Sequence, residues 1–158
     1  MEITIYGSYY PTTEKDLLLR LKTSLVSEGY VSSMLVDERP NPRRLNEWEL
    51  SKACLKFSDV NYLIFTHTGY RHGVIRELCQ CASVPSMIDR RWRCVVFEEI
   101  RGGRSALPVL NERELQELHE SKIRRIEFDN EDCLKRSAGG MALRYLKDLA
   151  EDLRSRAR

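Results

Sequence analysis

The chain has 158 residues, of which 42% are hydrophobic and 32% are charged, and its formal net charge is +2. This composition is typical of a soluble globular protein and excludes a disordered chain, while the small net charge gives no strong signal for nucleic-acid binding. No apolar run reaches the roughly 18 residues that span a bilayer, so we expect no membrane partner and a cytoplasmic location.

The first third of the chain predicts a strand, a helix and a second strand. The first strand, residues 3–6, ends at Gly7, and a capping-box pattern at Thr13 marks the start of a helix. Leucines at helical spacing line one face of this helix: Leu18, Leu21 and Leu25. Residues 30–36 form the second predicted strand, and two prolines make residues 37–42 a loop.

The middle of the chain holds its most informative segment. A capping box, Asn46-x-x-Glu49, predicts the start of the second helix. Residues 60–65 form a continuously apolar strand of the kind that is buried in a parallel sheet. A polar loop follows, and then a helix that opens at Gly73 and carries Glu77 in its predicted first turn.

The last third continues the alternation. Residues 93–97 and 123–128 are the fourth and fifth predicted strands, and residues 101–105 read as a loop. A further capping box begins at Asn111. The final helix is amphipathic, and Gly139-Gly140 is expected to separate it from a shorter turn.

Strands that alternate with helices predict an α/β layer fold. The simplest topology is a flavodoxin-like, doubly wound, five-stranded parallel sheet in the order 2-1-3-4-5, with residues 1–158 as a single domain.

The cysteines favour reduced thiols over a metal site, and no cofactor is expected. They are odd in number and scattered, and the pair at Cys79-x-Cys81 lacks a second pair at zinc-site spacing. The five cysteines are Cys54, Cys79, Cys81, Cys94 and Cys133.

Glu77 is the candidate catalytic residue. A carboxylate that follows a parallel strand lies in the crevice where ligands bind in such sheets. Backbone amides at a helix start favour its ionised form, which could attack a ribose carbon or stabilise an oxocarbenium-like transition state. The alternative is a structural glutamate that only complements the helix dipole.

Seven more residues could contact a substrate. Gly7 and Ser8 form a small-residue turn where a sugar or an anion could approach the backbone amides, although it could equally be an ordinary turn. Arg71 and His72 could reach a phosphate or protonate a leaving group, or could lie in a solvated loop. The aromatic side chains that could stack on a base, or simply pack, are Tyr9, Tyr10 and Trp48.

Several segments resemble the TIR-like nucleotide hydrolases and the nucleoside 2-deoxyribosyltransferase-like proteins. Residues 5–8 are similar to the opening strand and small-residue loop of both groups, and residues 59–66 to their third strand, which ends in a Thr or Ser, here Thr66. The segment Gly73-Val74-Ile75-Arg76-Glu77-Leu78 resembles the one that bears the catalytic glutamate. The resemblance implies that Glu77 is catalytic, that Thr66 lies at the substrate, and that the substrate carries an N-glycosidic bond, as in NAD or a nucleotide.

One position departs from the resemblance. Deoxyribosyltransferases carry an aspartate eight residues before the equivalent of Asp59, and this chain has Ser51 there. The departure favours an NAD- or nucleotide-cleaving enzyme, or a non-catalytic nucleotide-binding or assembly module, over deoxyribosyl transfer. The expected partners are a nucleotide and, from the resemblance, a second copy of the chain or an assembly partner.

Overall fold

The computed structural model describes residues 1–70, 72–83, 93–107, 116 and 123–157, and for His72 the backbone alone. The predicted capping box at Asn111 lies outside these residues. Within them, no helix is both long enough and apolar enough to cross a membrane.

The core of the molecule is a mixed β-sheet. Its strands are β1 (Glu2–Tyr6), β2 (Ser32–Leu35), β3 (Val60–Phe65), β4 (Cys94–Arg101), β5 (Arg104–Ser105) and β6 (Arg124–Phe128). β1 is parallel to β2 and β3, β3 is parallel to β4, and β4 is parallel to β6. The predicted order of the parallel strands is confirmed, since the fifth predicted strand is β6.

The prediction of a purely parallel, five-stranded sheet is wrong in one respect. Residues 101–105, predicted to be a loop, form a hairpin in which β5 pairs with β4 in the antiparallel direction. Gly102 and Gly103 make its turn with φ of 54° and 73°, a region that glycine enters without a steric penalty. Within the described residues, the sheet therefore has six strands.

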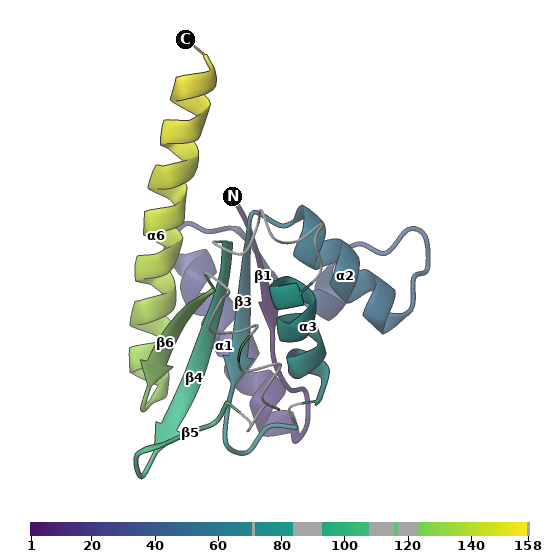
Figure 1. Cartoon of the computed structure of the whole chain (residues 1–158), viewed down its shortest axis with the longest axis vertical. Helices are drawn as coiled ribbons and strands as arrows, with labels where there is room; N and C mark the ends of the chain where they lie inside the picture. The colour runs from purple at the N-terminus through teal and green to yellow at the C-terminus, as the bar shows by residue number, and fades with distance from the viewer. Residues whose placement is uncertain (71, 84–92, 108–115, 117–122, 158) are drawn as a thin grey trace.

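Helices cover both faces of the sheet (Figure 1). One face packs against α1 (Thr12–Ser27) and α6 (Glu131–Arg156), and the other against α2 (Glu47–Phe57) and α3 (His72–Ser83). The predicted leucines of α1 belong to the first of these cores: Leu18, Leu21 and Leu25. All six residues of β3 are buried, as the apolar run predicted, because helices pack against both faces of this strand.

The predicted starts of the first two helices had different outcomes. The capping box of α2 is confirmed, because the Asn46 side chain accepts a hydrogen bond from the Glu49 backbone N–H at 2.9 Å, and the Glu49 carboxylate accepts one from the Asn46 N–H at 3.2 Å. The capping box at Thr13 is wrong, since α1 begins at Thr12 after Pro11, with no side-chain cap.

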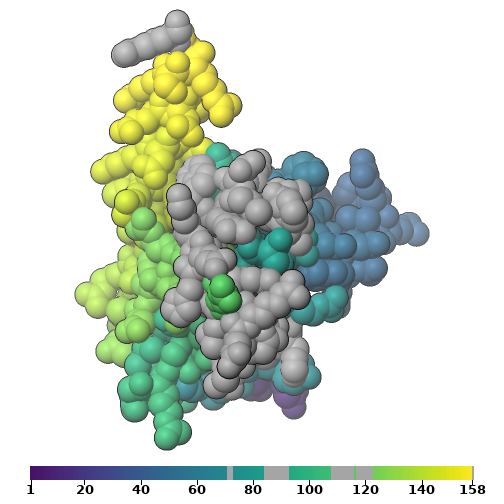
Figure 2. Space-filling view, viewed as in Figure 1, coloured from purple at the N-terminus to yellow at the C-terminus, as the bar shows by residue number. Residues whose placement is uncertain are grey.

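The expected break at Gly139-Gly140 is also wrong, because α6 runs through both glycines without interruption. A Cβ at Gly139 would collide with the Glu28 carboxylate at the end of α1, so the missing side chain lets the two helices approach closely. The C-terminal turns of α6 project beyond the body of the molecule (Figure 2).

Candidate active site

A cavity of about 580 Å³ lies beyond the carboxyl ends of β1 and β2. Its walls come from the β1–α1 loop, the 3-10 helix η1 (Val36–Glu38), and the first turns of α2 and α3. Crevices at this edge of a parallel sheet are where α/β proteins bind ligands. Among the residues predicted from the sequence, those that line the cavity are Gly7, Ser8, Tyr9, Tyr10, Trp48 and Glu77.

Glu77 lies at the wall of the cavity and is only 8% exposed. The Ser51 hydroxyl, on α2, donates a hydrogen bond of 2.6 Å to Glu77 Oε1. Burial raises the pKa of Glu77 from 4.5 to about 7, although the Ser51 hydrogen bond and the positive charge of Arg76 lower it in part. Both forms of the carboxyl group are therefore populated near neutral pH.

The predicted position of Glu77 within its helix is wrong. Because α3 begins at His72, Glu77 is its sixth residue and lies in the second turn. The backbone amides of the helix start therefore do not set its ionisation as expected. Burial dominates, and it favours the neutral acid.

Ser8 fixes the two loops that meet at the cavity. Its hydroxyl donates to the Tyr10 carbonyl oxygen at 2.6 Å, and accepts from the backbone N–H groups of Tyr10 at 3.1 Å and Tyr70 at 2.8 Å. A hydroxyl has one proton and two lone pairs, so these bonds use its full capacity. Ser8 thus shapes the wall of the cavity, and its hydroxyl has no bond left for a ligand.

Gly7 lines the cavity and also allows close packing against α1. A Cβ at Gly7 would lie 2.7 Å from Leu18 Cδ2, and Leu18 is only 1% exposed, so it has little room to move. The absence of a side chain at this position therefore lets β1 and α1 pack tightly next to the cavity.

Replacing Gly7 with alanine should lower the free energy of unfolding by about 1–3 kcal/mol, the usual cost of an inserted carbon in a packed core. Urea unfolding would measure the change. Gly140→Ala is the matched control: a Cβ there meets nothing within 4 Å, and alanine in a helix interior should add up to about 1 kcal/mol. A Gly7→Ala protein as stable as the wild type would contradict this account of the packing.

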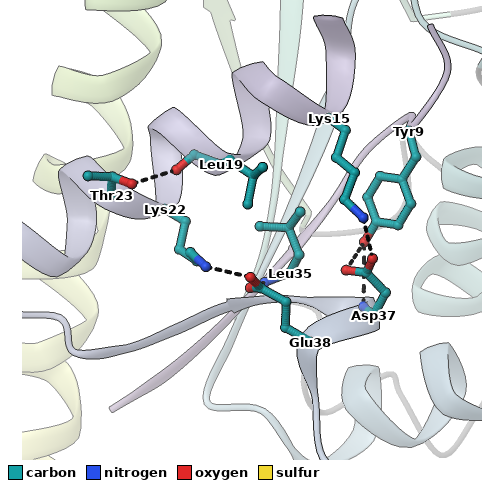
Figure 3. Close-up of polar contacts among 8 residues, drawn as sticks. All are labelled: Tyr9, Lys15, Leu19, Lys22, Thr23, Leu35, Asp37 and Glu38. Atoms are coloured by element: carbon teal, nitrogen blue, oxygen red, sulfur yellow. Dashed lines mark hydrogen bonds and ion pairs between the residues drawn. The ribbon is translucent and has the colours of Figure 1, made fainter. Parts of the chain in front are cut away.

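Tyr9 and Asp37 form a polar cluster at the rim, shown with Lys15 in Figure 3. The Tyr9 hydroxyl donates to Asp37 Oδ1 at 3.0 Å, and the Lys15 ammonium donates to Asp37 Oδ2 at 2.7 Å. The same ammonium lies 4.7 Å from the centre of the Tyr9 ring. Burial, followed by the negative charge of Asp37, raises the pKa of Tyr9 well above its usual range, so Tyr9 stays protonated and held in place.

Trp48 on α2 and Arg76 on α3 also line the cavity. The Arg76 guanidinium lies 4.3 Å from the centre of the Trp48 ring, a cation–π contact that joins the two helices beside Glu77. Trp48 is half-buried and lines the cavity, consistent with its predicted availability to a base.

Three predicted residues lie elsewhere or cannot be placed at the cavity. Thr66 is not among the lining residues. Its hydroxyl donates to the buried Glu14 carboxylate and accepts from the Gly69 N–H at 3.1 Å, so it orders the loop after β3. Arg71, and the side chain of His72, lie outside the described residues, and their roles stay predictions.

Neither a protein-family model nor a curated protein matches this sequence. Among solved structures, the fold is similar to that of BcmB, a CMP N-glycosidase from Clostridium botulinum, with a TM-score of 0.56 and 12% sequence identity. The similarity covers 87% of this chain and 97% of BcmB. At this identity it establishes the fold alone, which is shared with a nucleotide N-glycosidase.

Proposed function

We propose that this protein hydrolyses the N-glycosidic bond of a nucleotide, as a TIR-like enzyme with Glu77 as the catalytic carboxylate. The observation that carries the proposal is the position of Glu77, which is buried at the wall of a ligand-sized cavity and has a pKa of about 7. The similarity in fold to a nucleotide N-glycosidase supports the same class of reaction.

In the proposed reaction, the ionised Glu77 attacks the anomeric carbon of the sugar. A C–O bond forms as the C–N bond breaks, and the electron pair of the broken bond leaves with the base. Water then attacks the anomeric carbon of the glycosyl ester. This step releases the sugar with a new hydroxyl group, regenerates the Glu77 carboxylate and transfers one proton to solvent.

The charges around the cavity favour a cationic base. Among the described lining residues, Asp37, Glu47 and Glu77 are carboxylates, whereas Arg76 is the one lysine or arginine. Lys15 pairs with Asp37 at the rim and offsets its charge, so the negative charge that would attract a pyridinium ring and stabilise an oxocarbenium ion comes from Glu47 and ionised Glu77. The aromatic side chains beside it, such as Trp48, can also contact a cationic ring by cation–π interaction.

Leaving-group chemistry points in the same direction. The pyridinium of NAD departs as neutral nicotinamide and needs no proton, whereas a cytosine or a purine base leaves more readily when an acid protonates it. At the position where deoxyribosyltransferases carry a carboxylic acid, this chain has Ser51, which already donates its proton to Glu77. We therefore place NAD and related pyridinium nucleotides first among the substrates.

A substrate panel with product analysis by liquid chromatography tests the proposal. We expect base release from NAD, nicotinamide mononucleotide and nicotinamide riboside to be faster than from CMP, dCMP and AMP. Release from CMP alone would keep the enzyme class and overturn the preference for a cationic base. Binding of these compounds without release of any base would overturn the enzyme, and transfer of deoxyribose to an added base would overturn hydrolysis.

A further inference from the structure

Ser51 and Glu77 come from different helices, yet their side chains form a buried pair. Ser51 is 5% exposed and Glu77 is 8% exposed, and their hydrogen bond of 2.6 Å has the length that is usual between a hydroxyl and a charged carboxylate. A serine inside a helix commonly donates its proton to a carbonyl oxygen of the preceding turn. Ser51 instead donates to the carboxylate on α3.

This hydrogen bond has two consequences for a carboxylate that must attack a carbon atom. It uses one lone pair of Oε1 and makes that oxygen a poorer nucleophile, which favours Oε2 as the oxygen that forms the new bond. It also favours the charged form, because a hydroxyl donor is a better partner for a carboxylate than for a neutral acid. Burial opposes the charged form, and the donor on α2 offsets part of that effect.

We propose that Ser51 is a positioning residue, which holds the Glu77 carboxylate ionised and oriented towards the cavity. This inference rests on the proposed function for its effect on the reaction, but the pairing of Ser51 with Glu77 can be tested without any substrate.

The test must distinguish the effect of Ser51 on the pKa of Glu77 from the charges and titrations of other groups nearby. Arg76, on α3, carries a positive charge that lowers the pKa of Glu77. Burial raises the pKa of Tyr6, on β1, well above its usual range, so Tyr6 stays neutral. Asp37 and Glu47 line the same cavity, and the chain has three histidines. The measurement must therefore follow the NMR signal of the Glu77 carboxyl carbon itself.

The test is a carbon-13 NMR titration of the Glu77 carboxyl signal, assigned by its loss in Glu77→Gln. Ser51→Ala should raise the pKa of Glu77 by about one unit or more, the size expected for a hydrogen bond to a charged group. Ser51→Thr retains a hydroxyl and should stay close to the wild type. Ser27→Ala is the matched control, because the exposed Ser27 hydroxyl donates to the carbonyl of Ser24 in its own helix and has no other bond to the described part of the chain.

The pH dependence of base release provides the second readout. In Ser51→Ala, the rising limb of kcat/KM should move to higher pH by the same amount as the NMR pKa, with about a tenfold loss at pH 6.5 and a smaller loss at pH 9. If Ser51→Ala does not fold, Ser51→Cys keeps the size and weakens the donor, and it should shift the pKa in the same direction.

The outcomes separate the two proposals. An unchanged Glu77 pKa in a folded Ser51→Ala protein would overturn the role of Ser51, whatever the enzyme does. A shifted pKa with no base release from any variant would leave the pairing intact and overturn the proposed function instead.

Discussion

Replacing Glu77 with glutamine should lower kcat/KM for base release by two to four orders of magnitude, equivalent to about 3–5 kcal/mol of transition-state stabilisation. Glutamine keeps the size of the side chain and can still accept the Ser51 hydrogen bond. It lacks the charge that attacks the anomeric carbon and stabilises the oxocarbenium ion. Steady-state kinetics with NAD, at a pH above 7 where the wild-type carboxyl group is ionised, would measure the loss.

The matched control is Glu151→Gln, on the exposed outer part of α6, which should retain wild-type kinetics. Circular dichroism of both variants would establish that they are folded. A Glu77→Gln protein that binds nucleotide and releases base at the wild-type rate would remove Glu77 from the reaction.

The same substitution should make the protein more stable at alkaline pH. An unfolded glutamate ionises with a pKa near 4.5, whereas the folded protein holds Glu77 neutral up to about pH 7. Between these values the folded state binds more protons than the unfolded state, so the free energy of unfolding falls as pH rises. The full cost at pH 8 is about 3 kcal/mol, and glutamine does not incur it.

Urea unfolding at several pH values would test this prediction. Glu77→Gln should be more stable than the wild type by about 2–3 kcal/mol at pH 8, and the difference should shrink below pH 7 and vanish below pH 4.5. Glu151→Gln should show no comparable gain at pH 8. A Glu77→Gln protein no more stable than the wild type at pH 8 would contradict the burial of an ionisable group at this position.

These two predictions belong together. An enzyme that keeps a carboxylate in a buried site loses stability in order to keep a reactive group, and removing the group should raise stability as it lowers activity. If Glu77 were present only to cap or solvate a helix, its replacement by glutamine would not lower activity and raise stability together.

The parallel part of the fold could be predicted because its signals are local. The apolar run of Val60–Phe65 and the capping box at Asn46 each lie within a few residues, and both are observed in the structure. The hairpin of β5 was missed because a two-residue strand has too little periodicity to distinguish it from a loop. The two glycines of α6 were misread because the neighbour that requires Gly139, the Glu28 side chain, comes from a distant part of the chain.

The candidate site was predictable only in part, for the same reason. The motif around Glu77 drew attention to the residue. Its place in the second turn depends on where α3 starts, and its ionisation depends on what covers it. Ser51 and Glu77 are 26 residues apart in the sequence. Their contact depends on how α2 is rotated against α3, and no local sequence pattern indicates that rotation. The sequence drew attention to Ser51 only because it stands where deoxyribosyltransferases carry an aspartate.

The most direct test of the central claim is a proton NMR time course of NAD with a stoichiometric amount of the protein at pH 8, where Glu77 is mostly ionised. Stoichiometric protein makes even a single turnover visible. We predict that free nicotinamide and ADP-ribose appear in equal amounts with the wild type and not with Glu77→Gln. NAD that stays intact with the wild type, or that is cleaved equally by Glu77→Gln, would contradict the claim that this protein cleaves a nucleotide through Glu77.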